Sequence, residues 1–276
     1  MTSRVNALGL LAVGLVVCSA WATALAAEPV TIKTPDGKGA DASIDMNKPT
    51  TNLGNGTGMM VMAQPAGGRK AYIRFDLSAM KDPIKGAVLY LTVVPNTGTN
   101  PDHTFNVFGL NDGEDDEWIE GDGGDDNKPE NEITAKNAPG NSKGGGGPYD
   151  EQKKSGGGVD PAKTTFLGTI VVDNSNYRMN GKNAGVAFGS EAMVEFLQKD
   201  ANKLATFIIT RAKVSQQDII TFVTKENGKA QPPTLKVSSE PMEFPVQPKP
   251  TTAPASKPAS QPASAPGAAA TTQPAK

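Results

Sequence analysis

Residues 70–77 read Lys-Ala-Tyr-Ile-Arg-Phe-Asp-Leu, and this stretch decides the fold class. Its apolar residues recur at every second position and would share one face of an extended chain: Ala71, Ile73, Phe75 and Leu77. The positions between them place Tyr72, Arg74 and Asp76 on the opposite face. A period of two is typical of a β-strand with one face in a core and the other in solvent. We therefore predict a half-buried strand here.

The rest of the chain up to residue 244 repeats this pattern of short strands between turns. Residues 87–94 are apolar on both faces, which favours a central strand. One helix is expected after Ser190, a good N-cap, with Glu191 in its first turn. Further strands are expected at 104–110, 165–172, 205–211, 219–224 and 234–237. Many short strands with one short helix predict an all-β fold, a two-sheet β-sandwich over residues 27–244.

The first 26 residues have the pattern of a cleavable signal peptide. Arg4 precedes an apolar stretch, and Ala24-Leu25-Ala26 offers the small residues that a signal peptidase recognises. We predict export to an extracellular, cell-surface or periplasmic location, with no membrane insertion after cleavage. The alternative is a lipid anchor on Cys18, although Val17 is a poor residue before such a cysteine. Cleavage after residue 26 would remove the only cysteine, so the mature domain could form no disulfide.

Residues 245–276 consist mainly of Pro, Ala, Thr, Ser, Gln and Lys and contain no aromatic or acidic residue. Such a segment buries too little apolar surface to offset the entropy of ordering it, so we predict a disordered tail. It would serve either as a spacer to the cell envelope or as a passive end. The whole chain has a formal net charge of −2, and without a basic excess we expect no nucleic-acid partner.

Two polar segments interrupt the strands. Residues 112–132 contain eleven acidic residues and one lysine, and residues 139–158 are rich in glycine. We expect both to be surface loops, the second a mobile one. Calcium prefers several oxygen ligands, and the first loop offers Asp112, Asp115, Asp116, Asp122 and Asp125. The alternative is a solvated run of charge, because the glycine pattern of an EF-hand is absent.

The sequence contains no complete pattern of catalytic residues. Residues 140–144 match the G-x-S-x-G string of α/β-hydrolases, but that chemistry needs a histidine later in the chain. The only histidine, His103, comes earlier, and we expect it in a solvated loop. Carboxylate pairs for glycoside hydrolysis stay possible, since only their separation in space would identify them. The sequence therefore predicts a protein that is not an enzyme.

Several short strings, taken in order, resemble the DNRLRE (disaggregatase-related) family, which is also grouped as carbohydrate-binding module family 96. The strings lie at residues 40–42, 52–54, 71–77, 87–91, 117–120, 133–139, 220–226 and 233–237. The resemblance covers about residues 38–238 and implies a β-sandwich of jelly-roll type. One departure is that Ala135 or Lys136 stands where the family pattern has Trp. A sugar contact made by that Trp would be lost here.

The resemblance implies a secreted, non-catalytic carbohydrate-binding module whose partner is an extracellular polysaccharide or cell-envelope glycan. Aromatic faces and hydrogen-bonding side chains form such sites. The candidates are Tyr72, Arg74, Tyr90, Trp118 and Glu120. For Trp118 and the tyrosines, a structural role under a loop or a second sheet is the alternative. Two other functions stay open: a structural or adhesive protein of the cell envelope, and a glycan-active, disaggregatase-like enzyme.

Overall fold

The computed structural model describes residues 28–64, 67–94, 103–113, 116–124, 131–172, 184–214 and 219–248. The predicted signal peptide, residues 1–26, lies outside the described residues, as does the predicted tail from residue 249 onward. Gln247, inside the predicted tail, contacts the sandwich. Its Oε1 accepts a hydrogen bond from the Val171 backbone N–H at 3.1 Å, and its Nε2 donates to the Ala187 carbonyl at 2.8 Å. The packed chain therefore extends beyond residue 244.

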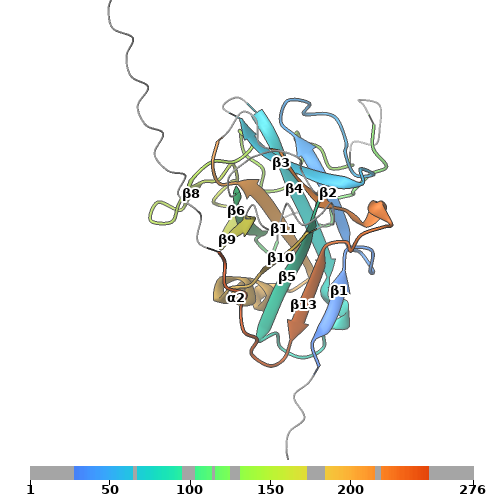
Figure 1. The fold of residues 1–276 in the computed structure, drawn as a ribbon, viewed down its shortest axis with the longest axis vertical. Helices are drawn as coiled ribbons and strands as arrows, with labels where there is room; N and C mark the ends of the chain where they lie inside the picture. The colour runs from blue at the N-terminus through green and yellow to red at the C-terminus, as the bar shows by residue number, and fades with distance from the viewer. Residues whose placement is uncertain are drawn as a thin grey trace, which may run out of the picture.

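The described strands form two antiparallel layers, which confirms the predicted all-β sandwich (Figure 1). One layer contains β1 (Val30–Lys33), β13 (Thr234–Ser238), β5 (Gly86–Val93), β10 (Ala184–Phe188) and β12 (Ile220–Val223). The other contains β2 (Ala40–Asp45), β4 (Gly67–Asp76), β11 (Leu204–Arg211), β6 (His103–Leu110) and β9 (Thr164–Val172). The strand predicted from residues 70–77 is thus β4, and β5 lies inside its layer as its apolar faces predicted.

Strand β3 (Gly58–Gln64) joins the two layers at one corner. Its first half, Gly58 to Val61, pairs with β12, and Met62 to Gln64 pair with β4. Strands that pass from one sheet to another in this way form the corners of orthogonally packed sandwiches. The remaining short elements are η1 (Leu77–Ala79), η2 (Lys225–Asn227) and a hairpin of β7 (Tyr149–Asp150) and β8 (Ser155–Gly156).

The predicted apolar face of β4 lies in the main core between the layers. Ile73, Phe75 and Leu77 are at most 1 % exposed and belong to one apolar cluster with side chains from both layers. Phe75 packs edge-on against Phe207 of β11, with ring centroids 5.8 Å apart. The assignment of this face is therefore confirmed.

The opposite face of β4 is buried too, so the prediction of a half-buried strand is wrong. Tyr72 is fully buried in a second apolar cluster, together with Phe108 of β6 and Ile208 of β11. Loop residues cover this face, among them Trp118, Ile133 and Val159. We call this cluster the outer core. The polar residues on this face of β4 pack under loops. The alternation of apolar and polar residues in the strand could not predict that loops cover them.

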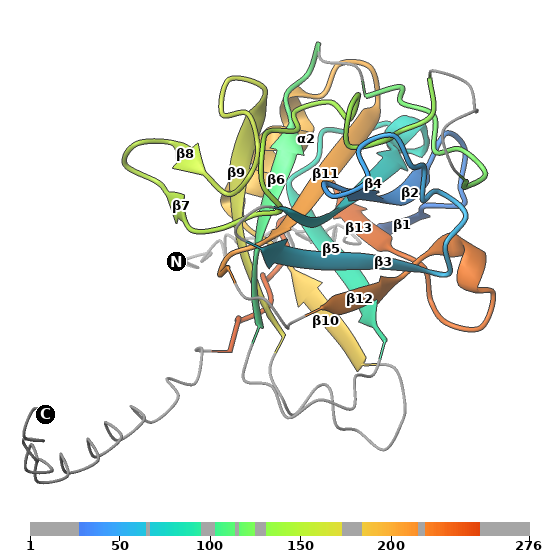
Figure 2. The same cartoon turned by 90° about the horizontal axis from the view of Figure 1, so that it is seen from above.

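The glycine-rich segment, expected as a mobile surface loop, forms part of the cover. Tyr149 stacks on Phe166 of β9 at 4.4 Å between ring centroids. The buried ammonium of Lys70 donates to Asn141 Oδ1 at 2.6 Å and to the carbonyls of Ser142 and Gly158. Figure 2 shows the β7–β8 hairpin of this segment projecting beside β9. The glycines of the segment indicated a loop with turns, but the sequence did not show that the buried Lys70 fixes this loop to β4.

Helix α2 (Glu191–Lys199) closes one end of the main core. Ser190 caps it as predicted, because its Oγ accepts a hydrogen bond from the Met193 N–H at 3.1 Å. Phe196 lies so close to Gly109 of β6 that a Cβ at this glycine would come within 2.6 Å of the ring. In the part of the chain that the structure describes, α2 is the one α-helix, and no helix there has the length and apolar character needed to span a membrane.

His103 is the first residue of β6 and only 2 % exposed, so its predicted place in a solvated loop is wrong. It pairs in register with Val172 of β9, which places the histidine inside a sheet.

Candidate functional site

A groove of about 410 Å³ runs beside the segment 117–120, and its walls include three of the residues predicted to bind sugar: Arg74, Trp118 and Glu120. The opposite wall is the turn of residues 37–40, which leads into β2. The site therefore lies at the edge of β2 and β4, where the loop cover of the outer core begins.

Asp76, the last residue of β4, shapes the 37–40 turn. Its Oδ2 accepts a hydrogen bond from the Lys38 N–H at 2.9 Å, and its Oδ1 accepts one from the Ser78 N–H at 2.9 Å. Gly37 has φ +55°, and a Cβ there would come within 2.2 Å of the Asp76 carboxylate. The turn needs a glycine for both reasons. It presents the Lys38 side chain at the rim of the groove.

Arg74 ties the two walls of the groove together. Its Nε donates to the Lys38 carbonyl at 2.7 Å, and its Nη1 donates to the carbonyls of Asp116 and Trp118 at 2.8 and 2.6 Å. The guanidinium carbon lies 4.8 Å from the centroid of the Trp118 ring, a cation–π distance. Burial lowers the pKa of Arg74, and nearby acids, Asp116 first among them, oppose this shift. Its Nε and Nη1 donors are used within the protein, so through these atoms Arg74 shapes the groove.

Trp118 has the structural position that the sequence left as an alternative. It is 4 % exposed, its Nε1 donates to Thr206 Oγ1 at 3.2 Å, and it meets the Tyr72 ring edge-on at 6.2 Å. The groups that face solvent at the groove are its neighbours. Ile119 is 50 % exposed, and the ion pair of Lys38 with Glu117, 2.8 Å long, is exposed as well. Sequence reasoning missed these three side chains.

The two predicted tyrosines lie outside the groove. Tyr72 is fully buried, and its hydroxyl donates to the Pro139 carbonyl at 3.0 Å, so its ring offers no face to a sugar. Tyr90 lies on β5 in the other layer, where it is half-buried with the Lys236 ammonium 5.3 Å from its ring centroid. The predicted sugar-binding residues therefore do not form one site.

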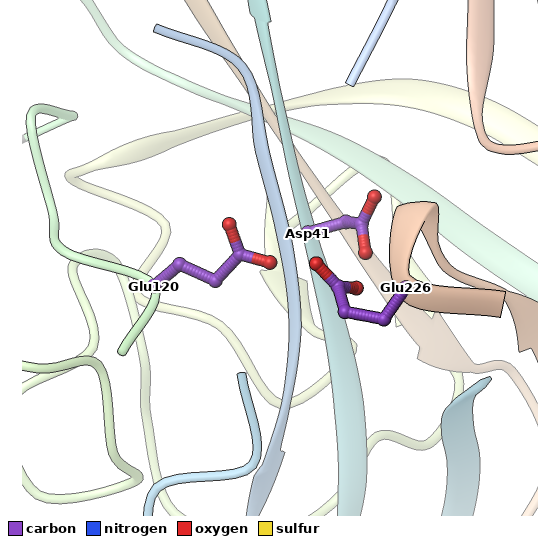
Figure 3. Close-up of side chains that lie close together, drawn as sticks. All are labelled: Asp41, Glu120 and Glu226. Carbon is purple, nitrogen blue, oxygen red and sulfur yellow. The ribbon is translucent and has the colours of Figure 1, made fainter. Parts of the chain in front are cut away.

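Glu120, which lines the groove, meets two acids from distant parts of the chain, Asp41 of β2 and Glu226 of η2. One carboxylate oxygen of each lies within 4.8 Å of the others, and Figure 3 shows the three side chains pointing toward one another. Asp41 is fully buried and accepts hydrogen bonds from the Lys225 N–H at 3.2 and 3.3 Å. We call this group the carboxylate cluster.

Lys225 neutralises only part of the carboxylate cluster. Its ammonium forms an ion pair with Glu120 Oε2, whereas Glu120 Oε1 and Glu226 Oε2 are buried without a hydrogen-bond partner. Burial raises the pKa of Glu120 to about 8, helped by the charges of Asp41 and Glu226 and opposed by Lys225. Burial likewise raises the pKa of Asp41 to about 7. The cluster can therefore hold protons near neutral pH, or a divalent cation in their place. Oxygen ligands about 2.3–2.6 Å from calcium are compatible with these separations.

The calcium ligands predicted in the acidic loop do not build this cluster. Asp112 and Asp116 line a different pocket, and Asp122 belongs to neither group. Asp115 and Asp125 lie outside the described residues. The signal for the observed cluster was present elsewhere, since the strings at 40–42, 117–120 and 220–226 carry one of its acids each.

The chain matches no curated protein. Residues 36–144 match the family model of carbohydrate-binding module family 96. This match contains Asp41, Arg74 and Glu120, and it ends before Glu226. This match supports the family that the sequence strings indicated, over residues 36–144 of the chain.

Proposed function

We propose that this chain is a secreted, non-catalytic module that binds an extracellular or cell-surface polysaccharide in the groove between the 37–40 turn and the segment 117–120. The observation that carries the proposal is that every lining residue of this groove except Leu204 lies within the matched segment, and that Asp76, Arg74 and Glu120 of that segment frame it.

The exposed groups of the groove supply the two kinds of contact that a sugar ring needs. Ile119 offers an apolar surface for the C–H face, and the Lys38–Glu117 pair offers a donor and an acceptor for hydroxyl groups. The fixed walls lower the entropy cost of binding, since Arg74 holds both of them before a ligand arrives.

Affinity electrophoresis and calorimetry with a panel of polysaccharides would test this proposal. We expect Lys38→Ala and Ile119→Ala to weaken binding about tenfold each, in line with about 1.5 kcal/mol for a lost contact to a charged group or a buried apolar one. Lys81→Ala, at another exposed lysine, is the matched control and should bind as wild type. If the panel binds and all three variants bind equally, the polysaccharide site lies elsewhere.

Glycan hydrolysis is the second candidate, favoured by one observation. Retaining glycosidases use two carboxyl groups about 5–5.5 Å apart, one of them with a raised pKa. In the carboxylate cluster one oxygen of each acid lies within 4.8 Å of the others, and Glu120 has a raised pKa. Against it, Asp41 is fully buried and its oxygens accept from the Lys225 N–H. Release of reducing sugar from a bound polysaccharide, abolished by Glu120→Gln, would favour this candidate. Binding without release would favour the module, or a structural or adhesive protein of the envelope.

Export is part of the proposal and rests on residues 1–26. Intact-mass measurement on protein recovered from outside the cytoplasm should give a chain that begins at Ala27 or Glu28. A lipid-modified Cys18 at the new N-terminus would instead show a membrane-anchored protein.

A further inference from the structure

A second pocket, separate from the carboxylate cluster, opens at the C-terminal end of α2. Its volume is about 260 Å³, which suits a small molecule or one sugar residue. Leu110, Phe196 and Leu204 give it an apolar floor, and Asp112, Asp116 and Asp200 supply acidic walls. Leu204 also lines the groove, so the two sites share a wall.

Asp200 lines this pocket and has one acceptor atom without a partner. It is 9 % exposed, and its Oδ1 accepts a hydrogen bond from the Lys203 N–H at 2.7 Å. Its Oδ2 is buried and has no hydrogen-bond partner. A buried acceptor without a partner is costly, and a donor in the pocket would remove that cost. Asp116, 3 % exposed, uses its Oδ1 to accept from Asn202 Nδ2 at 2.8 Å.

The field in the pocket is negative. Burial raises the pKa of Asp200, and the charges of Asp116 and Asp112 raise it further. Asp200 is also the C-cap of α2, where the unpaired carbonyls of a helix add a partial negative charge. Lys199 gives little compensation, since its exposed ammonium lies 3.9 Å from Glu195. A ligand with a positive charge would be stabilised here.

The geometry distinguishes the kind of cation. Among the described residues, the acids that bring three carboxylate oxygens within 4.8 Å of one another are those of the carboxylate cluster, not those of this pocket. Asp112, Asp116 and Asp200 therefore surround the space without converging on one metal ion. The apolar floor suits a cation with a carbon skeleton. We propose that this pocket binds a primary ammonium group carried on a small, partly apolar body.

Two sources could supply that ammonium: an amino sugar or a free alkylamine. The ammonium site itself does not depend on the polysaccharide proposal. Only the amino-sugar source does, because a polymer bound in the groove could reach the pocket across their shared wall at Leu204.

Amide NMR titrations of the full chain with glucosamine, cadaverine and N-acetylglucosamine would test the proposal. N-Acetylglucosamine is the neutral control, and all titrations are run at matched ionic strength. We expect saturable shifts at the amides of Phe196 and Leu204 with at least one of the two amines and not with N-acetylglucosamine. Tighter binding of glucosamine would identify an amino-sugar site, and tighter binding of cadaverine an alkylamine site. Equal shifts with the neutral sugar, or no saturable shift with either amine, would overturn the proposal.

Variants give the second readout. Asp200→Asn keeps the size of the side chain and the Oδ1 acceptor, and we expect it to weaken amine binding at least tenfold. Asp112→Asn, at an exposed wall residue that is safe for folding, should weaken it about threefold. Asp82→Asn, an exposed aspartate elsewhere with the same change in charge, should have no effect. Unchanged binding in a folded Asp200→Asn or in Asp112→Asn would contradict the proposal. Loss of polysaccharide binding in Lys38→Ala with amine binding retained would show that the two sites are independent.

Discussion

The main core and the outer core lie on opposite faces of β4 and are built by different rules. The main core is formed by apolar side chains from two sheets, as at Phe105 of β6 and Phe222 of β12. The outer core lies under loops, and it contains the buried cations Lys70 and Arg74. Loops bring backbone carbonyls without partners in a neighbouring strand, and buried carbonyls need donors. Lys70 and Arg74 supply several of these donors, together with the neutral Tyr72 hydroxyl, so the loop cover over β4 is held by buried polar side chains.

The largest expected effect tests the main core. Phe75→Ala removes a fully buried ring from the main core, and we expect it to lower the free energy of unfolding by about 3–5 kcal/mol. Denaturant unfolding followed by tryptophan fluorescence would measure the loss. A loss below about 1 kcal/mol would mean that the face of β4 has been assigned wrongly.

Substitution of Arg74 in the outer core should lower the free energy of unfolding nearly as much as Phe75→Ala. Sequence alone predicts a small cost for Arg74→Ala, as for an exposed residue. The structure predicts about 2–3 kcal/mol because three carbonyls, two of them in buried hydrogen bonds, lose a charged donor. Arg74→Lys should not restore this, since an ammonium cannot reproduce the planar fork. Hydrogen exchange should show faster opening of residues 116–120 than of β5. Uniform acceleration across both regions would contradict a separate role for the outer core.

The pH dependence of stability should separate the carboxylate cluster from the outer core. Between pH 5 and 7 the folded state keeps protons on Asp41 and Glu120 that the unfolded state has lost, so stability should fall with rising pH, by about 1–2 kcal/mol after solvent screening. Burial lowers the pKa of Lys70 to about 7, so above that pH the unfolded state binds the extra proton and stability should rise.

Single variants show which group causes the fall in stability and which causes the rise. Glu120→Gln should flatten the fall between pH 5 and 7, and Lys70→Met should flatten the rise between pH 8 and 9.5. Thermal unfolding across this range would measure both slopes. If Glu120→Gln leaves the fall in stability between pH 5 and 7 unchanged, the carboxylate cluster is not the titrating group.

The smallest expected effect concerns calcium. A divalent cation in the carboxylate cluster would relieve its two unpartnered oxygens, and a tenfold excess over the dissociation constant stabilises a protein by about 1.4 kcal/mol. We expect calcium to raise the melting temperature above that in sodium chloride of equal ionic strength, and Glu226→Gln to remove the difference. Asp112→Asn serves as the control from the acidic loop. Equal melting temperatures in the two salts would mean that the cluster binds no calcium and that Lys225 alone neutralises it.

The sequence predicted what depends on local pattern. The alternation of residues 71–77 identified the face in the main core, and Ser190 identified the start of α2. Each of these signals is carried by residues that are close together in the sequence. The polar residues of β4 were read as exposed, since no local pattern shows that loops far along the chain cover Tyr72 and Arg74. The carboxylate cluster was missed for the same reason, as its acids come from β2, the segment 117–120 and η2.

Strand β3 has a consequence for how this protein responds to force. Because its two halves pair with β12 in one layer and β4 in the other, the layers are connected by one continuous backbone at this corner. A tension that separates the layers must break a ladder of backbone hydrogen bonds there, in addition to exposing apolar side chains. We expect this corner to rupture last under load, so that the sandwich fails as a single unit and not by sliding of one sheet over the other.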